Sequence, residues 1–432
     1  MNKKNIPQNW IKTTAFLILY LCTLLYYPVF AFQTSDNNET AQDFNEYKGT
    51  VVDSENNDPL TSATVSLDGS NLSTVTNDDG VFLLKVPKNI TSGYIRVSYL
   101  GHKDKVLKLS DFSGENLKIK LEETITQLSE VNINPKDPEA LIRSVMKKKG
   151  ENYINQNTIM TAFYRETIKK RRSYVSLSEA VVDVYKSPYE SNRNDLIKLY
   201  RARKSADYKR LDTVAVKLQG GPSSTLYIDV MKNPDNVFTQ DMVGFYEFSF
   251  APSTKIDDKF IYVLNFKQRP NITEPLYEGK LYIDAETLAL RRAIFSLNTE
   301  DEEEVSKMFV RRKPSNADVY ITEAKYDINY RQNNGKWYYN YGKIGLEVKI
   351  DWKKKLFNSK YYLDVEMAIT DWRENESEIL KSKDRLKSTV VLADEAEGFS
   401  DPEFWGEYNV IEPEKSIESA IRKIQRQLKK LN

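Results

Sequence analysis

The side chains that most often catalyse reactions or bind metals are scarce in this chain. His102 is the only histidine and Cys22 is the only cysteine. A His-ligated zinc site or a Ser-His-Asp triad needs partners that the chain lacks. His102 follows Gly101 at an expected turn, so we predict a surface histidine. The sequence motifs of phosphate-binding loops, dinucleotide-binding folds, serine hydrolases and zinc proteases are also missing from the sequence.

Carboxylate chemistry is the kind of catalysis that the sequence leaves open. Arg165, Glu166, Glu179 and Asp183 lie within runs that otherwise read as half-buried strands. Charged groups in such strands must face water or be paired, and a cross-strand ion pair is the expected arrangement. An acid–base pair such as Glu166 with Glu179 is the alternative, because a sequence does not give the distance between two carboxyl groups. We assign no catalytic, cofactor-binding or metal-binding residue, and we predict that the protein is not an enzyme.

Length and charge narrow the class of protein. The 432 residues suffice for more than one domain, and the formal net charge is +1. A chain so close to neutral has no global field that would attract nucleic acid, so we predict no nucleic-acid partner. The 27 tyrosines and 18 phenylalanines are typical of an aromatic-rich β protein.

The first 31 residues have the pattern of a signal peptide. Lys3, Lys4 and Lys12 precede an apolar run at 15–27, and Val29 and Ala31 have the offsets that suit cleavage before Phe32. We therefore predict export to the periplasm or the outer membrane. A signal anchor that stays attached is the alternative.

The position of Cys22 inside this segment bears on lipidation and on disulfides. A lipoprotein cysteine is expected to follow a small residue, but Leu21 precedes Cys22. We interpret Cys22 as an apolar residue of the signal helix, with lipidation as the alternative. A mature chain without this segment has no thiol, which excludes disulfides and thiolate metal sites.

Short alternating runs between residues 46 and 122 predict a β-sandwich. Apolar and polar residues alternate in about seven runs, and this period of two indicates strands with one buried face. The runs are separated by Asn, Asp, Gly and Pro, as in small sandwiches. Asp79-Gly80 predicts a hairpin turn, since glycine tolerates a positive φ where the chain reverses.

Three stretches of this region carry a resemblance to a known family. They read GTVVDSENNDPLTSATVSLDG, STVTNDDGVFLLKVP and IRVSYLGHKDKVLKL. Together they resemble the carboxypeptidase regulatory-like domain, a transthyretin-like sandwich found at the N-termini of Bacteroidota envelope proteins. The stretch LEETITQLSEVNIN resembles the tail that leads into the plug of TonB-dependent receptors, but no plug or long barrel sequence follows. The resemblance implies an accessory domain without the catalytic residues of carboxypeptidases.

The rest of the chain predicts a helix and then a long series of strands. Asp137 is placed to cap a helix that starts at Pro138 and carries an apolar stripe. From Thr158 onward, long strands alternate with tight turns, such as those at 220–222 and 333–335. Successive antiparallel strands of this length indicate one large curved sheet or half-barrel, covered by a helix or loops.

Two further resemblances concern this second region. The combination FYRE, SEAVVDVYK, QGGP and YEGKLYIDAETLALRRAIFSL resembles a region of unknown function in Bacteroidota envelope proteins. The phrase GKLYIDAETLALRR is similar to one strand–turn–strand unit of lipoprotein-carrier half-barrels.

Two charged segments lie near the end of the chain. The acidic run 300–304 predicts a charged loop between strands, because neighbouring carboxylates repel one another. Apolar residues at helical spacing from Pro413 to the end predict an amphipathic helix with a basic polar face. This helix is expected to dock on the sheet, and contact with membrane phosphates or with a partner is the alternative.

These observations give a mainly β protein with a seven-stranded transthyretin-like sandwich and a larger antiparallel curved sheet or half-barrel with a few helices. The expected divisions are a signal peptide (1–31), a disordered linker (32–45), the sandwich (46–122), a second linker (123–137), the antiparallel β domain (138–395) and a tail with the amphipathic helix (396–432). We expect a non-catalytic envelope protein that presents a concave, tyrosine-rich sheet face to a lipid, a lipid-linked molecule or a protein partner, with the sandwich as a docking module. The alternatives are an accessory subunit of an outer-membrane receptor complex and a carboxylate-dependent hydrolase.

Overall fold

The computed structural model describes residues 44–428 except for several short segments. Those segments are 113–115, 125–136, 172, 207–217, 235–236, 238, 240, 257–258, 312, 354–357 and 399–403. The predicted signal peptide, most of both predicted linkers and Cys22 therefore lie outside the described residues. In the part of the chain described, no helix is long and apolar enough to cross a membrane.

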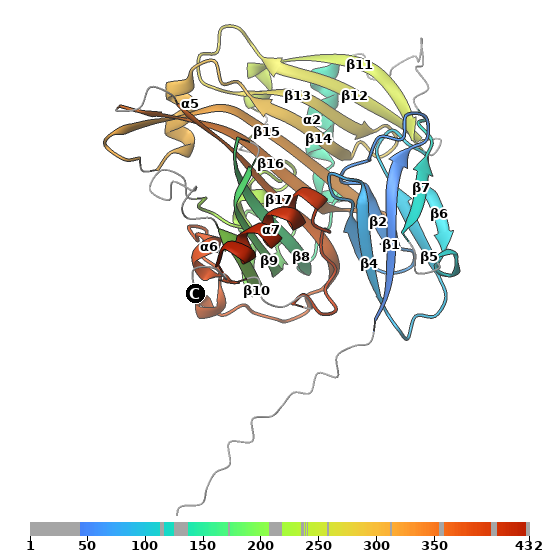
Figure 1. Cartoon of the computed structure of the whole chain (residues 1–432). Helices are drawn as coiled ribbons and strands as arrows, with labels where there is room; N and C mark the ends of the chain where they lie inside the picture. Colours follow the sequence, from blue (N-terminus) through green and yellow to red (C-terminus); the bar gives the residue numbers. More distant parts are fainter. Residues whose placement is uncertain are drawn as a thin grey trace, which may run out of the picture. The chain divides into compact units, whose positions relative to one another are not determined.

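The N-terminal strands form the predicted sandwich (Figure 1). One sheet has the order β4–β1–β7 and the other β3–β2–β5–β6. The seven strands are β1 (Phe44–Asp53), β2 (Thr64–Leu67), β3 (Ser73–Val75), β4 (Val81–Pro87), β5 (Tyr94–Ser98), β6 (Lys105–Lys108) and β7 (Leu117–Leu121). Alternate side chains such as Val65, Phe82 and Val97 are fully buried between the two sheets. The seven-stranded prediction is confirmed.

The turn at Asp79-Gly80 differs in role from the prediction. Gly80 has the expected positive φ of 74°, but β3 and β4 belong to different sheets, so the turn connects the two layers and forms no hairpin. A Cβ at Gly80 would lie 2.5 Å from the carbonyl oxygen of Val51. Asn77 Oδ1 accepts hydrogen bonds from the amides of Asp79 and Val81 and holds the turn.

A second, larger sheet has eleven strands among the described residues, in the order β11–β12–β13–β14–β15–β16–β17–β8–β9–β10–β18. Its strands are β8 (Thr158–Lys170), β9 (Ser173–Lys186), β10 (Leu196–Ala206), β11 (Tyr246–Ile256), β12 (Lys259–Gln268), β13 (Tyr277–Asp284), β14 (Leu290–Leu297), β15 (Ala317–Asn333), β16 (Lys336–Trp352), β17 (Ser359–Glu374) and β18 (Glu397–Gly398). All neighbours are antiparallel except β10 and β18. The sheet does not close on itself, which confirms a large open antiparallel sheet. Asn334 and Gly335, with φ of 48° and 76°, form the predicted hairpin turn between β15 and β16.

Helices are few, and one of them corrects a prediction. α2 (Pro138–Lys147) begins where expected, and Asp137 Oδ1 accepts a hydrogen bond from the amide of Glu139 at 2.9 Å. α7 (Lys415–Leu428) is the predicted terminal helix. The acidic run, however, starts α5 (Glu302–Phe309), with Asp301 as its N-cap. The loop prediction was wrong because carboxylates in the first turn of a helix are stabilised by the positive end of its dipole.

The central strands of the large sheet are buried on both faces. Most residues of β8 and β9 are buried. One face carries Phe163, Val181 and Tyr341, which pack against Trp405 and Ile411. These last two residues belong to a segment of residues 404–414, which we call the strap.

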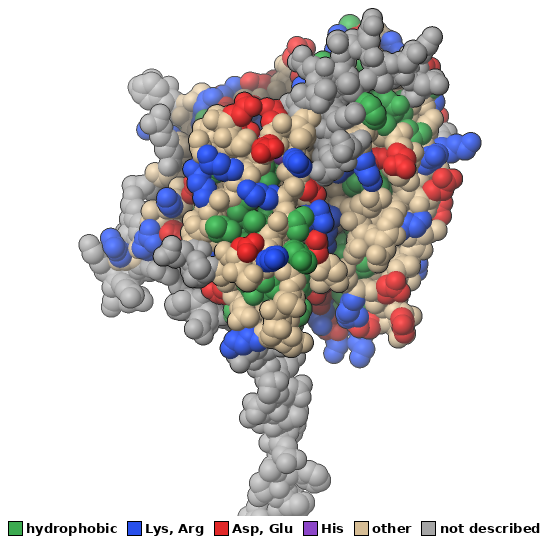
Figure 2. Space-filling view, turned by 90° about the vertical axis from the view of Figure 1, so that its right-hand side faces the viewer, with side chains coloured by type: hydrophobic (Ala, Val, Ile, Leu, Met, Phe, Trp, Pro, Cys, Tyr) green, Lys and Arg blue, Asp and Glu red, His purple; other side chains and the backbone are tan. Residues whose placement is uncertain are grey.

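The sandwich is joined to the strap by hydrogen bonds between distant parts of the chain. Thr74 Oγ1 donates to the carbonyl oxygen of Val410 at 3.0 Å, and Asn77 Nδ2 donates to that of Glu412 at 3.1 Å. On the side of the molecule in Figure 2, acidic and basic side chains are interspersed with small apolar groups, as the near-zero net charge predicts.

Candidate functional site

The second face of the large sheet, which we call the inner face, carries the tyrosine-rich surface that the sequence predicts. Tyr326, Tyr330 and Tyr339 lie on β15 and β16 and belong to one large apolar cluster, together with Met367 on β17. These three tyrosines are 6%, 6% and 1% exposed. Their burial shows that the surface is already covered.

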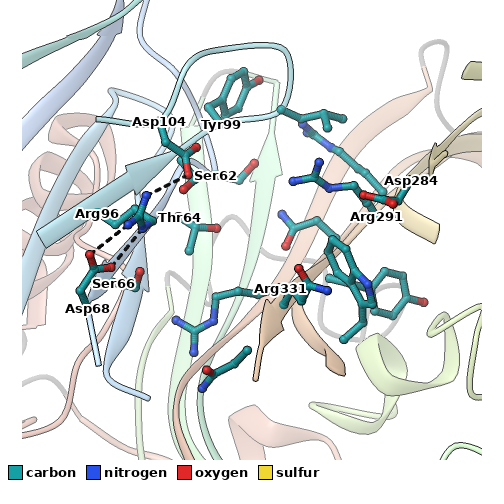
Figure 3. Close-up of a pocket in the computed structure, with 18 of the residues that line it drawn as sticks. Ser62, Thr64, Ser66, Asp68, Arg96, Tyr99, Asp104, Asp284, Arg291 and Arg331 are labelled. Carbon is teal, nitrogen blue, oxygen red and sulfur yellow. Dashed lines mark hydrogen bonds and ion pairs between the residues drawn. The ribbon is translucent and has the colours of Figure 1, made fainter. Parts of the chain in front are cut away.

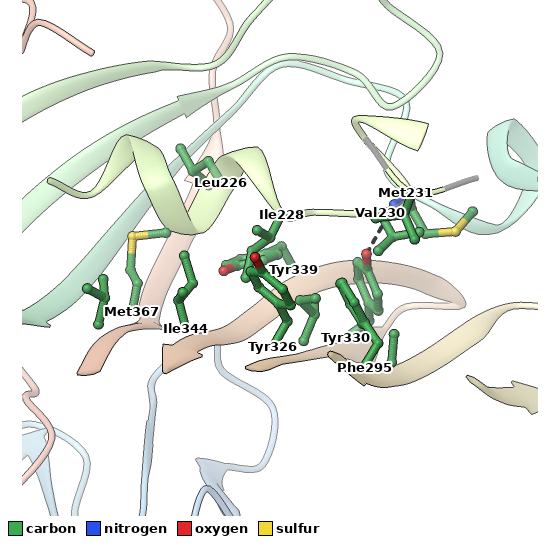
Figure 4. Close-up of a cluster of buried hydrophobic side chains, with 14 of the residues drawn as sticks. Leu226, Ile228, Val230, Met231, Phe295, Tyr326, Tyr330, Tyr339, Ile344 and Met367 are labelled. Atoms are coloured by element: carbon green, nitrogen blue, oxygen red, sulfur yellow. Dashed lines mark hydrogen bonds between the residues drawn. The ribbon is translucent and has the colours of Figure 1, made fainter. Parts of the chain in front are cut away.

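The covering segment comes from the chain itself. Residues 218–245, here called the cover, contain α4 (Ser223–Tyr227) and η3 (Met242–Phe245). The cover begins at the predicted turn, where Gly220 and Gly221 have φ of 117° and 50°. Its apolar side chains pack onto the inner face (Figure 4): Leu226, Ile228, Val230 and Met231. The expectation of an open tyrosine-rich face is therefore corrected.

One buried carboxylate fastens the cover to the sheet. Asp229 Oδ2 accepts hydrogen bonds from Lys186 Nζ at 2.8 Å and from the Tyr189 hydroxyl at 3.0 Å. Asp229 Oδ1 accepts one from the Tyr330 hydroxyl at 2.8 Å. The side chains of Lys186 and Asp229 are both 0% exposed, and Asp195 Oδ2 lies 2.8 Å from the same Lys186 Nζ. Burial alone would lower the pKa of Lys186, but the two carboxylates raise it, so the lysine stays charged.

The hydroxyl groups of the inner-face tyrosines form further hydrogen bonds with the backbone of the cover. The Tyr330 hydroxyl also accepts a hydrogen bond from the amide of Met231 at 3.2 Å (Figure 4). The Tyr339 hydroxyl donates to the carbonyl oxygen of Thr225 at 3.1 Å. The tyrosines of the inner face thus bind the backbone of the cover as well as its apolar side chains.

A cavity of about 610 Å³ opens at the margin of the cover. It lies between the cover, the connection from β9 to β10 and residues 385–388. Ile197, Leu226 and Leu386 form an apolar wall that is continuous with the main core. Tyr227 also lines the cavity, and it is 63% exposed.

Three positively charged side chains that line this cavity donate hydrogen bonds to neutral oxygen atoms. Lys232 Nζ donates to the carbonyl oxygens of Pro188 and Ser191 at 2.7 and 2.6 Å. Arg385 donates to the carbonyl oxygen of Leu380, and Arg193 to Ser191 Oγ and to an amide oxygen. Burial lowers the pKa of Lys232 to about 8, and the carboxylates of Asp195 and Asp229 offset only part of this effect. An anion placed here would favour the charged lysine.

The structure separates the two carboxylates that were considered as an acid–base pair. Arg165 and Glu179 are register partners on β8 and β9, whereas Glu166 is the partner of Ser178. Successive side chains of a strand point to opposite faces, so Glu166 and Glu179 lie on opposite sides of the sheet. They cannot act on one substrate together.

Glu179 belongs to the expected ion pair, and this pair is buried. Arg165 Nε donates to Glu179 Oε1 at 2.8 Å, and Arg203 Nε donates to Glu179 Oε2 at 2.8 Å. Burial alone would raise the pKa of Glu179, but the two guanidinium groups lower it below its usual value. Arg165 also donates to Glu366 and, at 2.6 Å, to the carbonyl oxygen of Ile411 in the strap.

The remaining candidates have local roles. Thr161 Oγ1 donates to Asp183 Oδ1 at 3.3 Å across the β8–β9 pair. His102 is 7% exposed, and its Nε2 lies 2.9 Å from Asp53 Oδ2. The prediction of a surface histidine was wrong, because the turn at Gly101 brings His102 against the end of β1. Within the described ranges, no three histidine, cysteine or acidic residues are grouped so as to hold a metal.

Glu166 lies on the inner face and predicts a dependence of stability on pH. The Tyr164 hydroxyl donates to Glu166 Oε2 at 2.9 Å, and burial raises the pKa of Glu166 to about 7. Its protonated form is therefore favoured in the fold, and this contribution is lost as the pH rises from about 4.5 through 7. We expect Glu166→Gln to raise the free energy of unfolding at pH 8 by about 1–3 kcal/mol and to have little effect at pH 4.

Urea denaturation at the two pH values measures this effect. Glu376→Gln is the matched control, since Glu376 is exposed. An equal effect of Glu166→Gln at both pH values would contradict the assignment of a protonated Glu166.

The sequence reasoning missed the residues that fasten the cover. Lys186, Asp195 and Asp229 are far apart in the sequence, and none of them lies in a recognisable motif. One signal was present. Lys186 ends a strand of alternating apolar residues at a position where the pattern requires a buried side chain, and a buried lysine requires an acidic partner.

Comparison with known proteins assigns the sandwich. Residues 47–133 match the CarboxypepD_reg-like domain. The match confirms the resemblance carried by the three N-terminal stretches, and it covers the sandwich but not the large sheet. No curated protein matches the chain at a significant level.

Three solved structures are similar to parts of the chain that include more than the CarboxypepD_reg-like domain. A DUF1329 family protein from Desulfovibrio piger is 12% identical, covering 56% of this chain and 96% of that one, with a TM-score of 0.25. A domain described as an outer membrane lipoprotein-sorting protein from Vibrio parahaemolyticus is 11% identical, covering 58% and 97%, with a TM-score of 0.26. Lipovitellin is 8% identical, covering 52% and 26%, with a TM-score of 0.23.

Proposed function

We propose that this chain is a non-catalytic binding protein of the cell envelope, which holds the apolar chain of an anionic amphiphile in the cavity beside the cover. The observation that carries the proposal is the combination of an apolar wall with a cationic rim in one cavity. At about 610 Å³ the cavity has the size of ordinary ligand sites, which are mostly apolar with a few polar groups that fix orientation.

The two sides of the cavity suit the two ends of such a ligand. Leu226 and Ile197 are 6% and 3% exposed and extend the core to the cavity wall, so an alkyl chain placed there would be removed from water. The neutral partners of Lys232 and Arg385 leave their charges available to a carboxylate or a phosphate.

The envelope location and the docking role of the sandwich are further parts of the proposal. The signal-peptide pattern of residues 1–31 and the CarboxypepD_reg-like domain support an exported envelope protein.

The sandwich has a strand edge at β6, where Val106 is 44% exposed. A partner's strand could add to this edge, which would make the chain an accessory subunit of an outer-membrane complex. This is the alternative function.

Tyr227 offers a test of the cavity. A fluorescent dodecanoate, displaced by oleate, reports binding to the purified chain. We expect Tyr227→Glu to weaken dodecanoate binding by about tenfold or more, because a carboxylate on the apolar wall must be desolvated when the alkyl chain binds. Arg385→Gln removes one rim charge and is expected to weaken binding by a few-fold.

Tyr94→Glu is the matched control, since Tyr94 is a 49% exposed tyrosine of the sandwich. Dodecanoate binding that is equal in the Tyr227→Glu and Tyr94→Glu variants would show that the cavity is not the binding site.

Lipid extraction and crosslinking in intact cells distinguish the proposed amphiphile-binding function from the alternative function as an accessory subunit. A co-purifying anionic amphiphile supports the first, whereas a crosslinked protein without lipid supports the alternative.

A further inference from the structure

A second cavity of about 360 Å³ lies between the sandwich and the large sheet. Its wall on the sandwich side comes from β2, β5 and the neighbouring turns, and its wall on the sheet side comes from β14, β15 and β16 (Figure 3). In contrast to the cavity beside the cover, its lining is dominated by charged, amide and hydroxyl side chains. We call it the polar cleft.

The charges on the sandwich side compensate one another. Arg96 Nε and Nη2 each donate to a carboxylate oxygen of Asp68 at 3.0 Å, and Arg96 Nη1 lies 3.7 Å from Asp104 (Figure 3). This wall therefore offers a ligand no uncompensated cation.

The sheet side differs, because it holds more cations than carboxylates. Arg292 is paired with Asp327 through two hydrogen bonds of 2.9 and 2.6 Å. Asp284 accepts hydrogen bonds from the amide and the hydroxyl of Thr287 within its own turn. Lys259, Arg291 and Arg331 also line this side of the cleft, and of these Arg331 carries the argument.

Arg331 is the residue on which the inference rests. Its Nη2 donates to the carbonyl oxygen of Asn71 at 3.1 Å, a neutral acceptor. Among the described residues this is its one hydrogen bond, although a guanidinium group has five N–H donors. Burial lowers the pKa of Arg331 to about 10, and the nearby Asp371 carboxylate and Tyr338 offset only part of this effect. A buried guanidinium whose hydrogen-bond partner is neutral is costly to the fold, and an anionic ligand would add the compensation that Asp371 does not supply.

A second donor in the lining lacks a partner. Trp337 is 3% exposed, and its Nε1 has no hydrogen-bond partner among the described residues. The guanidinium carbon of Arg291 lies 5.3 Å from the centre of the Trp337 ring. The Nε1 atom is itself inaccessible to solvent, so Trp337 contributes its ring to the lining and Arg331 is the charged donor that the argument uses.

Hydrogen bonds from the sheet hold the cleft open. Asn333 Nδ2 donates to Asn71 Oδ1 at 2.9 Å, and Asn340 Nδ2 donates to Thr64 Oγ1 at 3.0 Å. Asn71 Nδ2 in turn donates to the carbonyl oxygen of Trp372 at 2.7 Å. Both walls are therefore fixed before any ligand arrives, which reduces the entropy lost on binding.

We propose that the polar cleft binds a soluble acidic sugar, with its carboxylate or phosphate on Arg331 and its hydroxyl groups on the surrounding side chains. Guanidinium groups match the planar geometry of these anions. The hydroxyl and amide groups that would bind the sugar hydroxyls are Ser62, Ser66, Ser98, Asn329 and Gln332. This proposal concerns a different cavity from the proposed amphiphile site, so each can fail without the other.

Calorimetric titration of the purified chain with glucuronate and with glucose 6-phosphate tests the proposal. We expect at least one of them to bind in the micromolar to millimolar range, to bind more weakly at high salt, and to bind at least about tenfold more tightly than glucose. Arg331→Gln is expected to weaken that binding by about tenfold to a hundredfold, because a charge-assisted hydrogen bond is lost.

Arg422→Gln is the matched control, since Arg422 is exposed on α7. Arg331→Lys keeps the charge and should retain part of the affinity, which separates loss of charge from loss of folding. Thermal unfolding of each variant checks that the fold is intact. Equal affinity for glucose and glucuronate, no binding of either anion at 10 mM, or unchanged affinity of a folded Arg331→Gln variant would each overturn the proposal.

Discussion

Asp229→Ala is expected to lower the free energy of unfolding by about 3–5 kcal/mol, because removing one partner of a buried ion pair leaves the other charge poorly compensated. Asp229 and Lys186 are both inaccessible to water. The hydroxyls of Tyr189 and Tyr330 would lose their acceptor in the same change. Asp195 still compensates the charge of Lys186 in this variant, so the loss of stability is expected near the lower end of this range.

Urea denaturation at pH 7 measures the loss, and hydrogen exchange shows where it arises. We expect amides of the cover, such as those of Met231 and Lys232, to exchange faster in the variant than in the wild type. The control is Asp241→Ala, an exposed aspartate of the cover, for which we expect a change within about 0.5 kcal/mol. A loss of less than about 1 kcal/mol in Asp229→Ala would show that the apolar contacts alone hold the cover.

Arg165→Met is expected to cost a similar amount, about 3–5 kcal/mol, for a different structural reason. The arginine is 2% exposed and compensates Glu179 and Glu366. It also donates to the carbonyl oxygen of Ile411, so the strap loses one of its hydrogen bonds to the sheet. Methionine fills most of the volume, which limits the effect of a cavity.

Chemical denaturation measures the change in the free energy of unfolding, and limited proteolysis measures how readily the strap is cleaved. We expect cleavage within residues 404–414 to be faster in Arg165→Met than in the wild type. Arg422→Met replaces an exposed arginine and should leave both measurements unchanged. If Arg165→Met destabilises the protein without faster cleavage in the strap, the strap is held by its apolar contacts with Phe163 and Tyr341.

Strands and turns could be predicted from the sequence because their signals are local. Alternation revealed the sandwich strands, and Asn334-Gly335 identified the β15–β16 hairpin since its backbone requires positive φ at both residues. Asp137 and Pro138 marked the start of α2 for the same kind of reason. Each of these choices is made within a few neighbouring residues.

A cover of helix or loops was predicted for the large sheet, but the segment that forms it and the residues that fasten it could not be predicted, because they depend on contacts between distant residues. Nothing near Asp229 in the sequence indicates that Lys186 and Tyr330 will surround it. The tyrosines were recognised as one surface, but their hydroxyls find partners in a segment about a hundred residues away. Likewise, the charge of Arg165 predicted an ion pair but not the strap that packs over it.

The hydrogen bonds of Thr74 and Asn77 to the carbonyl oxygens of Val410 and Glu412 also constrain the order of folding. Residues of an early sandwich strand meet partners that a ribosome supplies more than 330 positions later. Contacts of such long range form late and slowly. The apolar surface of Phe163 and Val181 must therefore stay uncovered by the strap until residues 405–411 have been synthesised, and a chaperone that shields it during that interval would raise the yield of folded protein.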